Sequence, residues 1–151
     1  MLWLAQKKAL AVFGLLLSIA VMPLVSCSDE DGDWEEMKWT TSVKKGKGGV
    51  ISVGSEGGTF EFKCKNYSPW MTSVKQKEDG QQEQTFYVEE DDGYRDQNLY
   101  IEATWLTAKF TGHTLTVTIL PTTSQNQRTM TVNVTAGDIF DSFTFCQQGT
   151  N

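Results

Sequence analysis

Acidic side chains and a single imidazole are the residues of this sequence that could catalyse a reaction. Glu89, Glu90, Asp91 and Asp92 could supply the two carboxylates that a glycosidase places about 5 to 9.5 Å apart across the bond it cleaves. Four consecutive acids are more typical of a solvated loop. His113 is the only histidine and no Gly-x-Ser-x-Gly motif accompanies it, which argues against a histidine-rich metal site and a hydrolase triad. We therefore expect no enzymatic activity, no metal and no cofactor.

Cys64 and Cys146 could form a disulfide if the chain is exported. Alternation places Cys64 on the same face as Phe62, whereas Cys146 points away from the face that Phe143 and Phe145 share. A thiol on an inner face cannot reach one on an outer face without movement of the backbone. We expect two separate thiols, and a disulfide is the alternative.

Cys27 follows a segment with the composition of an export signal. Lys7 and Lys8 precede residues 9–21, which carry no charge, and the sequence Leu-Val-Ser leads directly to the cysteine. A basic start, an apolar centre and a small-residue cleavage site are typical of a secretory signal peptide. The alternative is a transmembrane helix, but the apolar run is at the short end of the range for spanning and Pro23 interrupts its end.

A cysteine directly after the expected cut resembles a bacterial lipobox. The resemblance implies that residues 1–26 are removed as a lipoprotein signal peptide and that a diacylglycerol is attached to the Cys27 thiol. The acids that follow, Asp29, Asp31 and Asp33, resemble the export signal of surface lipoproteins of Bacteroidota. The expected location is therefore the outer membrane, with a lipid anchor and exposure at the cell surface.

The net charge limits the partners of the mature chain. Residues 1–26 hold two lysines and no acid, so their removal leaves 11 basic and 19 acidic residues, a net charge of −8. This surface would repel nucleic-acid phosphates and anionic lipid headgroups. We therefore expect no nucleic-acid partner, and attachment to the membrane only through the lipid on Cys27.

Aromatic side chains that a core does not need are the candidates for ligand binding. Tyr87 and Trp105 each point away from the apolar residues of their own segments, and Tyr94 lies in a polar stretch with further hydrogen-bonding side chains. These are Asp96, Gln97 and Asn98. Rings that stack on sugars, beside amides and acids that bind hydroxyls, would form a glycan site where residues 89–98 meet Trp105. The alternative is that these aromatics only cover the surface, because single exposed aromatics are common.

Apolar and polar residues alternate with a period of two from about residue 48 onward, which predicts β-strands. The expected strands are 50–53, 59–65, 70–74, 85–89, 99–110, 114–119, 129–135 and 143–145. Trp70, Thr72 and Val74 are expected to share an inner face, and residues 99–110, apolar on both faces, predict a bulge or a change of sheet. No segment after the signal has a helical period. We predict an all-β fold, an antiparallel β-sandwich of seven or eight strands.

The chain is expected to have three parts. Residues 1–26 form the signal peptide, residues 27–47 form an acidic flexible tether that begins with the lipidated cysteine, and residues 48–151 form the sandwich domain. The tether contains Gly32 and Gly46 and shows neither the strand period nor the helix period.

Four short blocks of the domain occur in a specific order. They are Gly57-Gly58-Thr59-Phe60-Glu61-Phe62 with Asn66 and Trp70; Trp105-Leu106-Thr107-Ala108 with Gly112; Asn126 and Arg128 before residues 129–135; and Phe143-Thr144-Phe145-Cys146-Gln147. In this order they resemble the BACON domain of Bacteroidota, over residues 48–149. The resemblance implies an immunoglobulin-like sandwich of the kind common in surface lipoproteins and glycan-degrading enzymes.

The resemblance implies two functions. The family was proposed to bind carbohydrate, so the first expectation is weak binding of a neutral polysaccharide. The second is a non-binding module that spaces or scaffolds a surface assembly. A third hypothesis is an adhesin-like subunit that recognises a protein partner in a surface complex.

Overall fold

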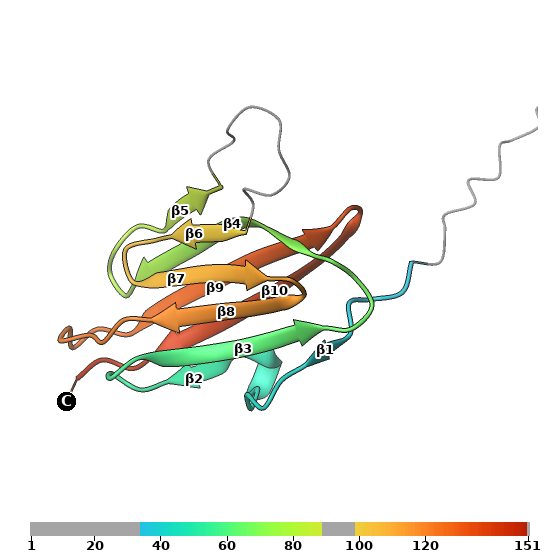
Figure 1. The fold of residues 1–151 in the computed structure, drawn as a ribbon. Coiled ribbons are helices and arrows are strands. Elements are labelled where there is room, and N and C mark those ends of the chain that lie inside the picture. Colours follow the sequence, from blue (N-terminus) through green and yellow to red (C-terminus); the bar gives the residue numbers. More distant parts are fainter. Residues whose placement is uncertain (1–33, 89–98, 151) are drawn as a thin grey trace, which may run out of the picture. The chain divides into compact units, whose positions relative to one another are not determined.

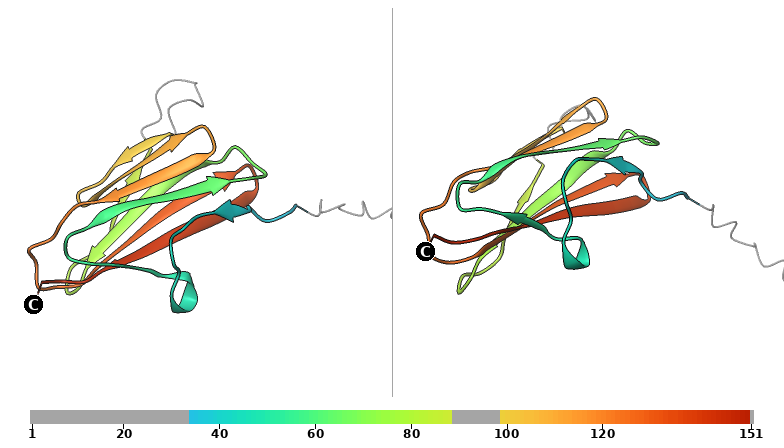
Figure 2. Two further views of the ribbon diagram at one scale, coloured as in Figure 1. Left: turned by 60° about the horizontal axis from the view of Figure 1, so that its bottom comes forward. Right: turned by 90° about the horizontal axis from the view of Figure 1, so that it is seen from below.

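The computed structural model describes residues 34–88 and 99–150, and the chain from Trp34 onward forms one compact unit. The strands of this unit form two five-stranded sheets, which are the two layers of a β-sandwich (Figures 1 and 2). The prediction of an all-β, immunoglobulin-like sandwich is therefore confirmed. Among the described residues, no helix is long and apolar enough to cross a membrane. Cys27 and the whole expected signal peptide lie outside the described residues.

The two sheets are called sheet A and sheet B here. Sheet A contains, in spatial order, β1 (Trp39–Thr40), β3 (Gly58–Cys64), β8 (Thr114–Ile119), β7 (Leu106–Thr111) and β6 (Tyr100–Glu102). Sheet B contains β2 (Ile51–Val53), β10 (Ile139–Gln147), β9 (Arg128–Ala136), β4 (Trp70–Glu78) and β5 (Gln84–Tyr87). A short 3-10 helix, Lys47–Gly49, precedes β2. The described pairings are antiparallel, except that β2 lies parallel to β10.

Alternating residues build the core between the sheets. In β8, Leu115, Val117 and Ile119 are buried, while the threonines between them are partly exposed. Phe62 of sheet A and Phe143 of sheet B meet with ring centroids 4.1 Å apart. Each fully buried side chain of this size contributes roughly 1.5 to 3 kcal/mol to folding. The period-two pattern of the sequence therefore arises because every second residue of a strand is buried on the inner face of its sheet.

Residues 99–110, expected to be a single strand, form two. β6 and β7 pair as a hairpin, and the Ala103 N–H donates to the Leu106 carbonyl at 2.9 Å across the turn. Ile101 and Ala108 are direct partners in register and both are buried. Because the chain reverses between β6 and β7, odd-numbered residues face the core in the first arm and even-numbered residues face it in the second, so the whole stretch contains apolar residues at both odd and even positions. The expected bulge or change of sheet is wrong here, and β1 and the extra strand bring the described strands to ten.

The N-terminal strap, residues 34–45, packs on the sandwich, although residues 27–47 were expected to be a tether. Met37 is buried, and Trp39 of β1 pairs with Cys64 of β3. The Trp39 ring meets Phe143 edge-on at 4.9 Å, and its indole N–H donates to Asp141 Oδ2 at 2.8 Å. The packed unit therefore begins before residue 48. The sequence did not predict this because a strand of two residues is too short to produce a recognisable period.

Asn66 fixes the strap to the end of β3. Its Oδ1 accepts from the Lys38 N–H at 2.8 Å, and its amide N–H donates to the Glu36 carbonyl at 2.9 Å. The hydroxyl of Tyr67 donates to the Glu35 carbonyl at 3.0 Å. Three backbone groups of the strap are thus bound by two side chains that follow β3.

Trp70 does not lie in the core, contrary to expectation. The register of β4 against β9 shifts between Met71 and Ser73, which indicates a β-bulge. The extra residue inverts the alternation, so that Met71 is fully buried and Trp70 is only half-buried. Val74, beyond the bulge, is inward as expected. A bulge cannot be located from a period-two pattern alone, which is why this face was misassigned.

Both cysteines in the described part of the chain are free thiols. Cys64 is buried at the end of β3. Cys146 is half-buried and lies between Phe145 and Gln147, which are both fully buried, so it faces outward. The prediction of two separate thiols is confirmed.

Candidate ligand-binding groove

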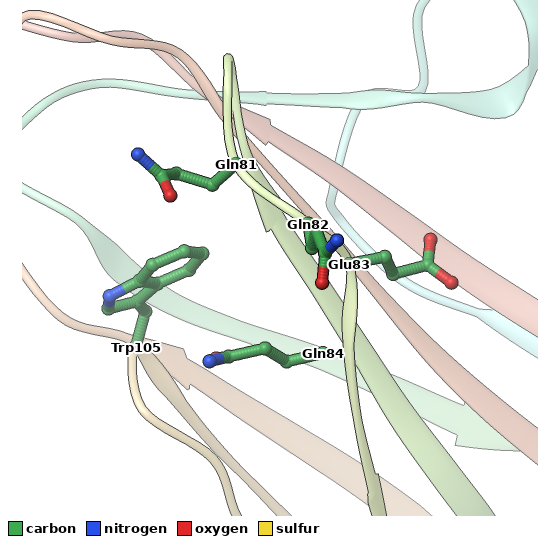
Figure 3. Close-up of a pocket in the computed structure, with 5 residues that line it drawn as sticks. All are labelled: Gln81, Gln82, Glu83, Gln84 and Trp105. Carbon is green, nitrogen blue, oxygen red and sulfur yellow. The ribbon is translucent and has the colours of Figure 1, made fainter.

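A shallow groove of about 390 Å³ lies between the β4–β5 hairpin and the β6–β7 turn. Figure 3 shows the indole of Trp105 on one side of the groove and the residues of the hairpin on the other. The hairpin residues are Gln81, Gln82, Glu83 and Gln84. Gln81 and Gln84 point toward the Trp105 side, whereas the carboxylate of Glu83 points away from it (Figure 3). We call this feature the indole groove.

The turn of the β4–β5 hairpin requires a glycine. Gly80 has a φ of 80°, a backbone conformation that glycine adopts at no steric cost. The Gln81 N–H donates to the Glu78 carbonyl at 2.9 Å, and the Asp79 N–H donates to Gln127 at 2.9 Å. These bonds fix where β4 ends, so that the glutamines of the turn and of β5 follow directly along the groove.

Trp105 is positioned by its backbone. Its N–H donates to Oε1 of Gln76 at 3.3 Å, and its carbonyl accepts from the Leu120 N–H at 2.8 Å. Gln76 is only 1% exposed, and its Nε2 donates to Oε1 of Gln84 at 3.0 Å. The buried amide of Gln76 therefore links the backbone at Trp105 to the side chain of Gln84, which lines the groove.

The side chain of Trp105 is backed by a cation. The guanidinium carbon of Arg128 lies 4.4 Å from the ring centroid, within the range of a cation–π interaction. Arg128 Nε also donates to Oε2 of Glu78 at 3.1 Å, across the register pair that these residues form in β4 and β9. Arg128 covers part of the indole ring, and Trp105 also lines the groove.

Glu78 is the centre of a polar cluster behind Trp105. Its Oε1 accepts from the Ser124 hydroxyl at 2.5 Å and from the Asn126 amide at 3.3 Å. The hydrogen bond from Ser124, followed by that from Arg128, lowers the pKa of the Glu78 carboxyl below its ordinary value. Glu78 is therefore ionised at neutral pH and keeps Arg128 in place.

The groove combines an aromatic surface with neutral amides. Each glutamine offers both a donor and an acceptor, and these groups match the hydroxyls of an uncharged ligand. An indole presents a large apolar face with a small loss of conformational entropy on binding. Among the described residues, no three His, Cys, Asp or Glu side chains come together as a metal site.

The predicted site residues are only partly brought together. Trp105 lines the groove, but Tyr87, 72% exposed, lies on the outward side of β5, whereas Gln84 of the same strand bonds to the inward Gln76. Tyr87 is therefore not part of the indole groove. Four further predicted residues lie outside the described residues: Tyr94, Asp96, Gln97 and Asn98.

The sequence interpretation missed the residues that face Trp105. The glutamines at positions 81, 82 and 84 were not among the predicted ligand contacts. Arg128 was not among the predicted site residues; it bonds to Glu78 and also stacks on Trp105. The available signal was the run of amides after Asp79-Gly80, which becomes informative only when the hairpin is placed beside the indole.

Comparison with solved structures finds a similar fold in a bacterial protein. The structure is similar to the NMR structure of a protein from Bacteroides thetaiotaomicron, with 34% sequence identity over 82% of this chain and 96% of that chain, and a TM-score of 0.61. The M1 domain of titin also matches, with 10% identity over 78% of this chain and 97% of that chain and a TM-score of 0.42. Titin M4 matches with 13% identity over 78% of this chain and 99% of that chain and a TM-score of 0.39. Both TM-scores are too low to carry an inference. No family model matches the chain, and no curated protein matches it.

Proposed function

Since the chain belongs to the same family as the Bacteroides thetaiotaomicron protein, we propose that it is a lipid-anchored outer-membrane lipoprotein whose BACON-like sandwich binds neutral glycan at the cell surface. The Bacteroides relative, the lipobox-like sequence before Cys27 and the order of the four BACON-like blocks support this proposal. The binding is non-catalytic, and the lipid on Cys27 holds the sandwich at the membrane.

The observation that carries the proposal is the indole of Trp105 beside a row of glutamines. The ring supplies a stacking surface for the apolar face of a sugar, and Gln81 and Gln84 supply donors and acceptors for its hydroxyls. Arg128 behind the ring keeps it in place without a ligand, which lowers the entropy cost of binding.

An open groove encloses little of a ligand, so the affinity is weak. We expect a dissociation constant of about 0.1 to 1 mM, equivalent to roughly −4 to −5.5 kcal/mol. The mature net charge of −8 favours neutral over acidic glycans, because a polyanion is repelled at low salt.

Affinity electrophoresis tests this function. The full-length chain is run in gels that contain xyloglucan, galactomannan, arabinoxylan or glycogen, beside Trp105→Ala and a matched control, Trp34→Ala, whose ring is exposed outside the groove. We expect at least one gel to retard the wild type and Trp34→Ala, and to release Trp105→Ala. Equal retardation of all three proteins would place the site elsewhere.

The lipid anchor has its own test. Growth of cells with a fatty-acid analogue should label the wild type and not Cys27→Ala, which is also expected to keep residues 1–26 and migrate as a larger precursor. Equal labelling of the two proteins would reject the lipobox.

The outer face of sheet A favours the second candidate, a structural spacer. Thr118 is the register partner of both Thr59 and Thr107, and Thr114 is the partner of both Lys63 and Thr111. These pairs consist of threonine and lysine, and Tyr100, the partner of Lys109 on the edge strand β6, adds one exposed ring to this face rather than a cluster of rings. If no gel retards the wild type, the spacer takes precedence over glycan binding in the indole groove.

A further inference from the structure

The outer face of sheet B carries three aromatic side chains, of which Tyr87 and Phe140 are exposed and Trp70 is half-buried. Trp70 of β4 and Phe140 of β10 are both register partners of Thr135 in β9, the strand between them. Met71, Val134 and Asp141 are the next residues on these strands and pair with one another on the inner side. Register partners in a sheet share a face, so Trp70 and Phe140 both point outward from sheet B.

A third ring lies in the neighbouring row. Tyr87 of β5 pairs with Ser73 of β4, which pairs with Asn133 of β9 and through it with Ser142 of β10. This row lies directly beside the one that contains Thr135. Trp70, Tyr87 and Phe140 are named here the aromatic strip.

The polar residues between the rings are covered although they point outward. Thr135 is 4% exposed and Ser73 is 7% exposed, whereas their aromatic partners Phe140 and Tyr87 are 73% and 72% exposed. The covered groups are bound within the protein. The Thr135 hydroxyl donates to the Ile139 carbonyl at 2.9 Å, and Asn133 Nδ2 donates to the Ser73 hydroxyl at 3.0 Å. The polar residues beneath the strip are therefore hydrogen-bonded within the protein, while the rings of Tyr87 and Phe140 remain exposed and that of Trp70 is partly exposed.

The two rows contain no charged side chain. They consist of aromatic, hydroxyl and amide residues, and the first charge along β4 is Lys75, in the row beyond. We propose that the aromatic strip is a second glycan-binding surface, which takes the flat face of an extended, neutral, β-linked polysaccharide. This inference rests on the proposed glycan-binding function but uses different residues.

The geometry favours a polymer chain over a single sugar. The backbones of β4 and β10 at Trp70 and Phe140 are separated by two strand spacings, about 9.5 Å, which is comparable with the repeat of a disaccharide unit in an extended chain. The indole groove and the strip lie on opposite sides of β5, since Gln84 bonds inward to Gln76 and Tyr87 points outward. The groove encloses part of one sugar, whereas the strip supports a flat chain.

The same surface is small for a protein partner. Three aromatic side chains bury at most about 450 to 750 Å², which is below the roughly 800 Å² per partner of a standard protein interface. The absence of charge within the two rows also removes the groups that steer and orient a protein complex. A second copy of the chain is therefore the less favoured occupant.

Pull-down on insoluble polysaccharide tests the proposal. The full-length chain in detergent is mixed with cellulose powder and with chitin powder, both neutral β-linked polymers, and the bound fraction is measured. The comparison is among the wild type, Tyr87→Ala/Phe140→Ala, Trp105→Ala and the control Tyr100→Ala, an exposed tyrosine on sheet A. Circular dichroism verifies that each variant is folded.

We expect at least one polymer to retain the wild type and Tyr100→Ala, and the bound fraction of Trp105→Ala measures how much the indole groove adds to that retention. The double variant should partition onto that polymer about tenfold less, as expected for the loss of two aromatic contacts. Retention of the double variant at the wild-type level overturns the strip, as does a wild type that neither polymer retains. A wild-type dimer that the double variant converts to a monomer would instead identify an interface between copies, and also overturns it.

The pull-down separates the strip from the indole groove. Loss of retention in the double variant, with no retardation of the wild type in soluble-glycan gels, supports the strip and rejects the groove. Retardation that depends on Trp105, with unchanged retention of the double variant on powder, supports the groove and rejects the strip.

Discussion

Two tryptophans at opposite edges of sheet A differ in how much of each is used by the protein itself. Trp39, in β1, packs edge-on against Phe143 and donates its indole N–H to Asp141. Trp105, in the β6–β7 turn, is partly buried against the core and backed by Arg128, and it also lines a groove. The difference shows that an aromatic residue becomes a candidate for binding only when its own fold leaves part of it unused.

The strongest test of this comparison is the loss of Trp39. Because its ring and its hydrogen bond both serve the strap, Trp39→Ala should lower the free energy of unfolding by about 2 to 4 kcal/mol, slightly less than for a fully buried ring. Urea unfolding monitored by circular dichroism measures this change. The control Trp34→Ala, an exposed ring in the same strap, should stay within about 0.5 kcal/mol of the wild type. Equal effects for both would mean that the strap is not part of the fold.

Asn66 should give the next largest effect. Asn66→Ala removes two hydrogen bonds to the strap backbone, and should cost about 1 to 2 kcal/mol in the same unfolding experiment. Asn66→Asp keeps the acceptor for the Lys38 N–H and loses the donor to Glu36, so its stability should lie between those of the wild type and the alanine variant. An alanine variant as stable as the wild type would show that Asn66 does not hold the strap.

On the groove side, Glu78 should produce a smaller and pH-dependent effect. The pKa of Glu78 is lowered in the folded state, so its contribution to stability is fully present above the ordinary value of 4.5 and is lost as the pH falls through the folded pKa. Glu78→Gln should therefore be less stable than the wild type at pH 7, and the two should converge in acid. Urea midpoints at pH 7 and pH 3 measure the difference. A gap that stays constant with pH would exclude the carboxylate as its source.

Much of the fold could be predicted from the sequence, because buried inner faces impose a period of two. β3, β8 and β9 follow that period closely, with alternate residues buried. The pattern fails where the local geometry departs from a regular strand. The bulge after Met71 turns Trp70 outward, and the tight turn at Ala103 makes two strands of one apolar segment.

The candidate site was less predictable than the fold. Trp105 was identified because its parity differs from that of its neighbours, and Tyr87 was identified as outward for the same reason. Their separation onto two sides of β5, and the approach of Gln81 and Arg128 to the indole, depend on contacts between strands that are distant in the sequence. The alternation along a strand shows to which face of the sheet a side chain points, but it does not show which residues of other strands that side chain contacts.

The most direct test of the comparison is an NMR titration that follows the indole N–H signals. A neutral oligosaccharide from the polysaccharide that most retards the wild type is added to the ¹⁵N-labelled chain, and the signal missing from Trp105→Phe assigns the Trp105 indole. The account predicts that this signal shifts and saturates with a dissociation constant of about 0.1 to 1 mM, while the Trp39 signal stays in place. A Trp39 shift as large as that of Trp105, or a Trp105 signal that does not move at saturating ligand, would contradict it.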